Sequence, residues 1–178
     1  MRLLLAAILA ALAASASAFA RPAALPAEAG RPFYAATPVA GPVALHERPG
    51  GRILARVGTR TEFGSPETLG VTERRGNWLA VISTSLPNGV VGWVPRRGLE
   101  LKPVQWSVDI SLSQRLLVVR HGGEVVRSVT VGIGAPGSPT PAGRFVITDH
   151  IETNAQQRAV YGPVVLALSG KQTHPPAG

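Results

Sequence analysis

Short apolar runs, separated by glycine, proline and asparagine, are the feature that most constrains the fold of this 178-residue chain. Runs of this length, often alternating with polar residues, are typical of strands and too short for ordinary helices. The sequence therefore predicts a mainly β fold with very little helix. The expected strands are 53–57, 68–72, 78–82, 90–94, 106–111, 116–120, 124–131, 144–148 and 164–168.

The chain contains no cysteine. Disulfide bonds therefore cannot support a small core, and packing and sheet hydrogen bonds must hold the fold together. The same absence excludes a thiol nucleophile among these residues. The length fits one ordinary domain or two small ones, and we expect two small modules.

The first twenty residues predict export. Arg2 gives a positive start, an apolar run at 3–14 follows, and small residues around Ala18 and Ala20 offer cleavage sites. A membrane anchor is the alternative, but the run is shorter than the roughly 20 apolar residues that a transmembrane helix needs. We therefore expect a signal peptide at 1–20 and a location in the periplasm or cell wall, with no stable membrane span after its removal.

The rest of the chain divides at changes in composition. Residues 21–42 are rich in alanine and proline without periodicity, which predicts a poorly ordered linker. Residues 43–101 carry closely spaced short strands, which predicts a small β-barrel. A second β module is expected at 106–178, after a boundary at Lys102-Pro103.

The charge is strongly basic and comes mainly from arginine, since Lys102 and Lys171 are the only lysines. The net charge is +8 at pH 7 and the pI is about 11.4. The arginines are spread through strands and turns, without the basic run or stacking aromatics of a nucleic-acid-binding face. We expect peptidoglycan or another anionic cell-envelope polymer as the partner, and no nucleic acid.

Residues 132–137 match the letters of the dinucleotide-binding glycine fingerprint. That fingerprint works only where a strand leads into a helix whose N-terminus holds the pyrophosphate. Pro136, Pro139 and Pro141 prevent a helix from starting there. No nucleotide site is predicted.

The histidines and serines give no support for a metal or hydrolase site. The four histidines are His46, His121, His150 and His174. Their spacing lacks the helical pair of zinc proteases, so surface positions are expected and no metal is predicted. No serine lies in a Gly-x-Ser-x-Gly elbow.

Two tryptophan-containing segments carry a first resemblance. Residues 76–81 form a turn followed by Trp78 and a strand, and residues 89–95 hold a Gly-Trp-Val strand with Trp93. Together they resemble the closing strands of bacterial SH3-like domains, many of which are thought to contact peptidoglycan. Either tryptophan can line a ligand groove, but aromatic side chains in a small barrel more often fill its core, and we favour the core.

A longer series carries a second resemblance. It contains a strand at 106–111, a Gln-x-Leu hairpin start at Gln114, a strand ending in Gly132, and the turn Thr-Pro-x-Gly-x-Phe at 140–145. In this order the segments resemble the N-terminal half of an L,D-transpeptidase catalytic domain. The resemblance implies an incomplete β-sandwich of that type over 106–178.

The turn at 140–145 predicts a rigid corner from its residues alone. Thr140 precedes a proline and is pushed toward an extended backbone, Pro141 fixes its own φ, and Gly143 can take angles that a side chain forbids. We assign Thr140, Pro141, Gly143 and Phe145 to the scaffold. The stretch around Tyr161 resembles the family region that leads toward the active-site groove, so Tyr161 is the candidate substrate-binding residue.

The family's catalytic His-Gly and Ser-(His or Asn)-Gly-Cys segments have no counterpart after Leu168, and His174 is followed by proline. We therefore expect a truncated and inactive chain with no catalytic residue of its own. Intact members cross-link peptidoglycan stem peptides through a cysteine thioester and need no cofactor. The alternative function is a non-catalytic wall-binding protein acting through the SH3-like module.

Overall fold

The computed structural model describes residues 33–172, and the predicted signal peptide lies outside the described residues. The fold is mainly β, as the sequence predicted. In chain order the elements are β1 (Phe33–Pro38), β2 (Val43–His46), β3 (Ile53–Val57), β4 (Leu69–Arg75), β5 (Trp78–Ile82), β6 (Gly92–Pro95), β7 (Leu99–Val104), β8 (Trp106–Ser111), β9 (Leu116–His121), β10 (Glu124–Thr130), β11 (Ile147–Glu152), α1 (Ala155–Tyr161) and β12 (Val164–Leu168).

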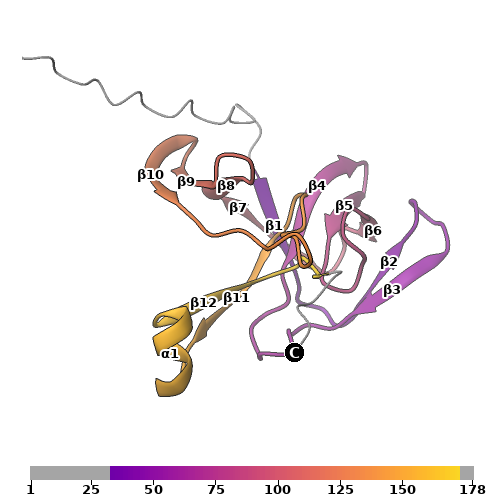
Figure 1. Ribbon diagram of the computed structural model, residues 1–178. Coiled ribbons are helices and arrows are strands. Elements are labelled where there is room, and N and C mark those ends of the chain that lie inside the picture. The colour runs from indigo at the N-terminus through magenta and orange to yellow at the C-terminus, as the bar shows by residue number, and fades with distance from the viewer. Residues whose placement is uncertain (1–32, 173–178) are drawn as a thin grey trace, which may run out of the picture.

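Seven strands form an antiparallel sheet in the order β3-β2-β6-β5-β4-β1-β7 (Figure 1). Its central strand β5 is buried at three consecutive residues, 79–81, which is typical of a strand covered on both faces. The core comprises Ala36, Leu45, Val57, Leu69, Leu79, Val81, Leu86 and Val94. Burial of these aliphatic side chains contributes most of the stability of this part.

The closed barrel predicted for residues 43–101 is not found. Within residues 33–172 no pairing joins the edge strands β3 and β7, so the sheet is open. Strands β2 and β6 meet through a single residue pair, His46 and Trp93. The sheet extends at its other side through β1, which lies outside the predicted module, and β7, which crosses its end.

Strand β1 gives residues 33–38 of the predicted linker an ordered structure, while residues 21–32 of that linker lie outside the described residues. Its residues pair with β4 on one side and β7 on the other, and Ala36 is completely buried in the core. The sequence does not indicate this strand, because its small alanine side chains and its final proline are typical of linkers. The neighbouring strands β4 and β7 supply hydrogen bonds that stabilise this segment as a strand, although its own residues have little strand propensity.

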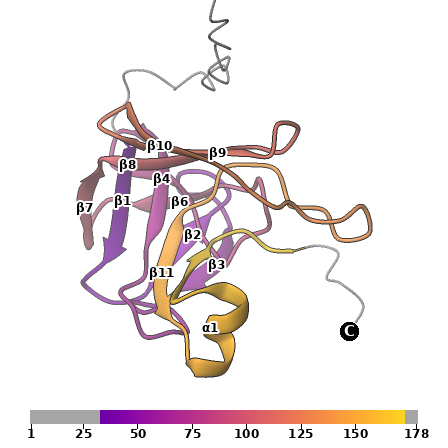
Figure 2. The same cartoon turned by 60° about the vertical axis from the view of Figure 1, so that its left-hand side comes forward.

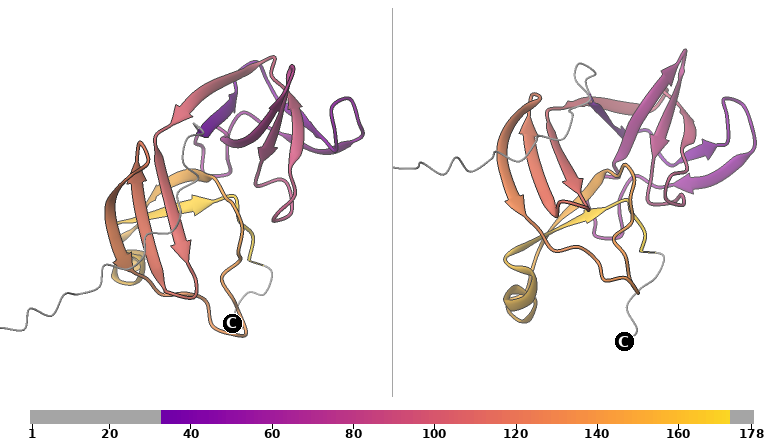
Figure 3. Two further views of the ribbon diagram at one scale, coloured as in Figure 1. Left: turned by 90° about the horizontal axis from the view of Figure 1, so that it is seen from above. Right: turned by 45° about the horizontal axis from the view of Figure 1, so that its top comes forward.

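The second part of the chain contains a three-stranded sheet, β10-β9-β8, and the hairpin β11-β12 (Figure 3). Strands β8 and β12 have the predicted bounds, whereas β11 begins three residues later than predicted. Val146 packs against Gly70 of the first sheet instead, and the Arg144 guanidinium lies 5.5 Å from the centroid of the Phe33 ring. Apolar side chains of β8 and β12 stay exposed within the described part of the chain, among them Trp106, Ile110, Leu166 and Leu168.

The short helix α1 was not predicted. Asn154 caps it, because its side chain accepts from the backbone N–H of Gln157 at 2.9 Å while the Gln157 side chain accepts from the N–H of Asn154. This capping box is visible in the sequence as Asn-x-x-Gln. None of the helical structure in residues 33–172 has the length and apolar character of a membrane span.

Candidate functional site

The loop between β10 and β11 folds back on itself. The backbone N–H of Gly134 donates to Thr140 Oγ1 at 2.7 Å, and the N–H of Ser138 donates to the carbonyl of Ala135 at 2.9 Å. The Gln172 side chain donates to Ser138 Oγ at 2.8 Å. These bonds give a loop without regular structure a defined conformation.

Phe145 stands at the end of this loop. A side chain on Gly143 would contact the far edge of the Phe145 ring, and one on Gly170 would lie 2.9 Å from it. Gly143 has a φ of +144°, which non-glycine residues rarely adopt. The ring therefore packs against two glycines from separate segments.

The ends of the hairpin are fixed beside this ring. The Val146 N–H donates to Ser169 Oγ at 3.0 Å, and the Ser169 N–H donates to the Val146 carbonyl at 2.9 Å. Ser169 is 3% exposed. The loop, the Phe145 ring and the start of the hairpin thus form one corner.

Replacing Gly134 with alanine is expected to displace this loop. The new Cβ would collide with the carbonyl oxygen of Ser138 and lie 2.6 Å from the backbone N of Thr140, so backbone must move. The loop is exposed, and the free energy of unfolding should fall by less than about 1 kcal/mol. Limited proteolysis of the full chain should become several-fold faster between residues 131 and 146.

Gly137→Ala is the matched control, since a Cβ there meets no atom within 4 Å. It should leave the cleavage rate near that of the unsubstituted chain. Equal acceleration by both substitutions would contradict a steric role for Gly134.

Tyr161 does not lie with the other predicted residues. It is the last residue of α1 and 65% exposed. The helix connects the end of β11 to the start of β12, whereas the corner lies at the other end of this hairpin. The structure therefore brings Thr140, Pro141, Gly143 and Phe145 into one region and places Tyr161 apart from them.

A buried acidic pair lies between the two parts of the chain, and sequence reasoning missed it. Asp149 on β11 accepts a hydrogen bond from Thr61 Oγ1 at 2.6 Å and is 4% exposed. Glu67, in the segment before β4, is also 4% exposed, and its Oε1 has no hydrogen-bond partner. Pairing of such distant residues leaves no local pattern in the sequence.

The pKa values of the two carboxyls move in opposite directions. Burial raises the pKa of Glu67 above its ordinary value, and the negative charge of Asp149 adds to this. Burial also acts to raise the pKa of Asp149, but hydrogen bonds from Thr61, Ser65 and Thr148 outweigh it and leave that pKa lowered. Asp149 therefore loses its proton at a lower pH than an ordinary aspartate, and Glu67 loses its proton at a higher pH than an ordinary glutamate.

Further contacts fix the hairpin against the first sheet, and Figure 2 shows β11 beside β4. Val146 packs on Gly70 of β4, where an added Cβ would lie 3.1 Å from Val146 Cβ. The Asn88 side chain donates to the carbonyl of Lys171 at 2.7 Å and accepts from its N–H at 2.8 Å. The second part therefore docks through β11 and through the segments that precede β11 and follow β12, which lie at the same end of the hairpin.

The two tryptophans of the first sheet differ in their surroundings. Trp93 is 7% exposed, as favoured for a core aromatic, with the Arg75 guanidinium 4.8 Å from its ring centroid. Trp78 is half-buried and lines an open depression of about 510 Å³. Its ring meets the His46 ring edge-on at 5.3 Å.

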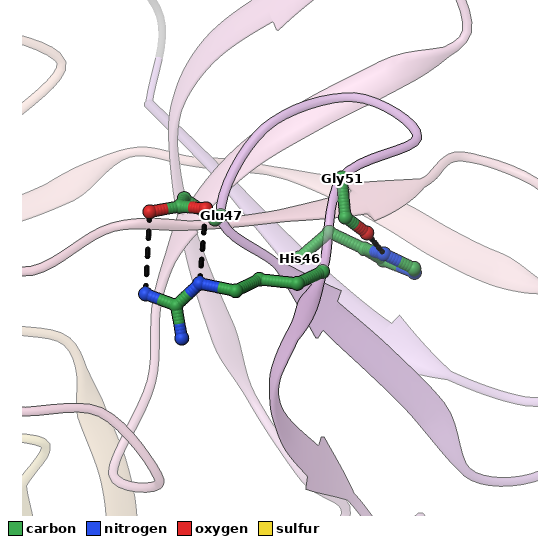
Figure 4. Close-up of polar contacts among 4 residues, drawn as sticks. His46, Glu47 and Gly51 are labelled. Atoms are coloured by element: carbon green, nitrogen blue, oxygen red, sulfur yellow. Dashed lines mark hydrogen bonds and ion pairs between the residues drawn. The ribbon is translucent and has the colours of Figure 1, made fainter.

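His46 is held by the turn between β2 and β3. Its Nδ1 lies 2.6 Å from the carbonyl of Gly51, and Glu47 and Arg52 form a two-bonded ion pair across the same turn (Figure 4).

Among residues 33–172, no three histidine or acidic side chains group in a way that could hold a metal ion.

Comparison with known families finds a match in the second part of the chain. Residues 105–171 match the model of the L,D-transpeptidase catalytic domain, YkuD. No curated protein and no solved structure matches the chain significantly. The matched stretch contains the corner at Phe145, the hairpin β11-β12 and Tyr161, and leaves out the seven-stranded sheet apart from its connection to β8.

Proposed function

We propose that this chain is an exported peptidoglycan-remodelling protein of the L,D-transpeptidase type. The match of residues 105–171 to the L,D-transpeptidase catalytic domain carries the proposal. The defined corner in that stretch supports it, because a catalytic domain needs a rigid base for its reactive residues. We place the protein in the periplasm or cell wall, in agreement with a polymeric envelope substrate.

The reaction of this family needs a thiol. A cysteine thiolate attacks the amide carbonyl carbon of a peptidoglycan stem, forming a C–S bond and breaking the C–N bond, and the released D-alanine takes a proton from histidine. An amine of a second stem then attacks the thioester, re-forms a C–N bond and frees the thiolate. These 178 residues contain no cysteine, so any such nucleophile must come from outside them.

The described residues would supply the frame for this chemistry. We assign Thr140, Pro141, Gly143 and Phe145 to the scaffold that positions the hairpin, on account of the contacts of the loop and ring. Tyr161 is exposed and free to contact a substrate strand beyond the end of the hairpin. Residues 43–101, extended by β1 and β7, would form an SH3-like positioning module despite the open sheet.

Incubation of the full 178-residue chain with purified sacculi tests this proposal. We expect the chain to co-sediment with sacculi at low salt, because its net charge is +8. Muropeptide analysis should show no new L,D cross-links and no release of D-alanine, because these residues lack the cysteine that would form the thioester. Cross-linking by these residues alone would overturn the mechanism.

The coding sequence downstream of the codon for Gly178 provides the complementary observation. A frame that continues into His-Gly and Ser-x-Gly-Cys supports the enzyme. A stop codon in that place would remove the enzymatic part and favour the second candidate, a wall-binding protein acting through the first sheet. The basic charge and the Trp78 depression favour this second candidate.

A further inference from the structure

The depression beside Trp78 combines an aromatic face with positive charge. It is lined by Asn77, Trp78, Pro95, Arg96, Arg97 and Leu99. These residues come from the start of β5, the end of β6 and the turn into β7, which meet because Trp78 pairs with Pro95 across the sheet. The backbone N–H of Arg96 donates to the Asn77 carbonyl at 2.8 Å and fixes the two rims together.

The arginines of this depression differ from most others nearby. Arg75 is engaged with Glu73 and Trp93, and Arg74 donates to the Gly76 carbonyl. Within residues 33–172, the exposed guanidinium groups of Arg96 and Arg97 make no hydrogen bond or ion pair. Two adjacent charged donors thus remain available beside the half-buried indole of Trp78.

Two free guanidinium groups and an aromatic face suit a ligand that carries a carboxylate next to an apolar or sugar surface. Guanidinium groups bind carboxylates through paired, charge-assisted hydrogen bonds. An aromatic ring at the side of the site provides a flat surface for packing. The open shape admits a segment of a polymer rather than enclosing a small molecule.

We propose that the depression formed by Trp78, Arg96 and Arg97 binds the carboxylate-bearing repeat of peptidoglycan. The inference rests on the proposed association of the chain with the cell wall and assigns that association to one site. The partner is a carboxylate of the stem peptide, with the neighbouring sugar ring or aliphatic chain against the indole. Phosphate-bearing wall polymers share the negative charge, and the test separates them.

Arg96→Gln/Arg97→Gln in the full chain is the deciding variant. Its fraction bound to sacculi stripped of phosphate polymers is expected to fall about ten-fold at low salt, because both charge-assisted contacts are lost. Arg56→Gln/Arg127→Gln is the matched control, since it removes the same charge from exposed positions outside the depression. The control should lose less than about two-fold. Equal losses in both variants, or no binding once phosphate polymers are removed, would overturn the assignment.

A soluble probe tests the site independently of the binding of the chain to intact sacculi. Titration of the full chain with a disaccharide-tetrapeptide muropeptide should shift the amide NMR signals of Trp78, Arg96 and Arg97. Absence of these shifts while the chain still binds sacculi would refute the site and leave the proposed function intact. Shifts without sacculus binding would support the site and count against wall association.

Discussion

Replacing Asp149 with alanine is expected to lower the free energy of unfolding of the full chain by about 2–3 kcal/mol at pH 7. The ionised carboxylate accepts from Thr61 Oγ1 at 2.6 Å, and hydrogen bonds from Ser65 and Thr148 also stabilise its charge. Removal leaves the part-buried hydroxyls of Thr61 and Ser65 without this acceptor. Urea denaturation followed by circular dichroism measures the change.

Glu152→Ala is the control for this prediction, because Glu152 is an exposed carboxylate on the same strand. It should change the stability by less than about 0.5 kcal/mol. A double-mutant cycle with Thr61→Ala isolates the bond between the two parts, and we expect a coupling of about 1 kcal/mol or more. Additive effects would show that the bond contributes nothing to docking.

This coupling matters for function because Asp149 lies inside the stretch that matches the L,D-transpeptidase domain, whereas Thr61 lies in the first sheet. The bond crosses 88 positions of the sequence. Fixing β11 to the first sheet therefore also fixes the corner at Phe145, which is continuous with that strand. The orientation of the matched stretch relative to the first sheet depends on these few buried polar contacts.

The strands were the most predictable part of this fold. β3, β5, β8 and β12 occupy the residues that the apolar runs indicated. In each of them, β-branched or aromatic residues gather between turn-forming ones, so local chemistry and tertiary partners agree. Residues 132–143 form no helix or strand, because their prolines and glycines prevent regular structure.

Features that depend on distant partners could not be predicted in this way. β1 became a strand because β4 and β7 flank it, although its alanines indicate no such preference. The sheet stayed open, since strand order depends on long-range pairing rather than on the strands themselves. For the candidate site, the sequence indicated a corner from Thr140 to Phe145 but gave no sign of the contacts with Gly170 and Ser169.

Glu67→Gln is expected to stabilise the full chain at pH 7.5 by about 1–2 kcal/mol. Burial and the charge of Asp149 raise the pKa of Glu67 from its ordinary value of 4.5. The folded chain therefore holds this proton more tightly than the unfolded chain. The stabilising contribution of protonated Glu67 is complete below the unfolded pKa and is lost as the pH rises through the folded pKa.

Asp149 responds in the opposite sense, because its pKa is lowered in the folded chain. Its contribution is present above the unfolded pKa and is lost as the pH falls through the folded pKa. Glu67→Gln removes the loss of stability at rising pH and leaves the loss of stability at falling pH that is due to Asp149. Stability should then fall less than in the unsubstituted chain between pH 4.5 and 7.5.

Thermal unfolding at several pH values measures this difference, with Glu62→Gln as the control at an exposed carboxylate five positions earlier. The control should leave the pH dependence unchanged. If Glu67→Gln shifts Tm equally at pH 4.5 and pH 7.5, ionisation of Glu67 does not oppose docking. A gain confined to neutral pH would instead identify the unpartnered Glu67 oxygen as the point where rising pH weakens the junction between the first sheet and the hairpin β11-β12.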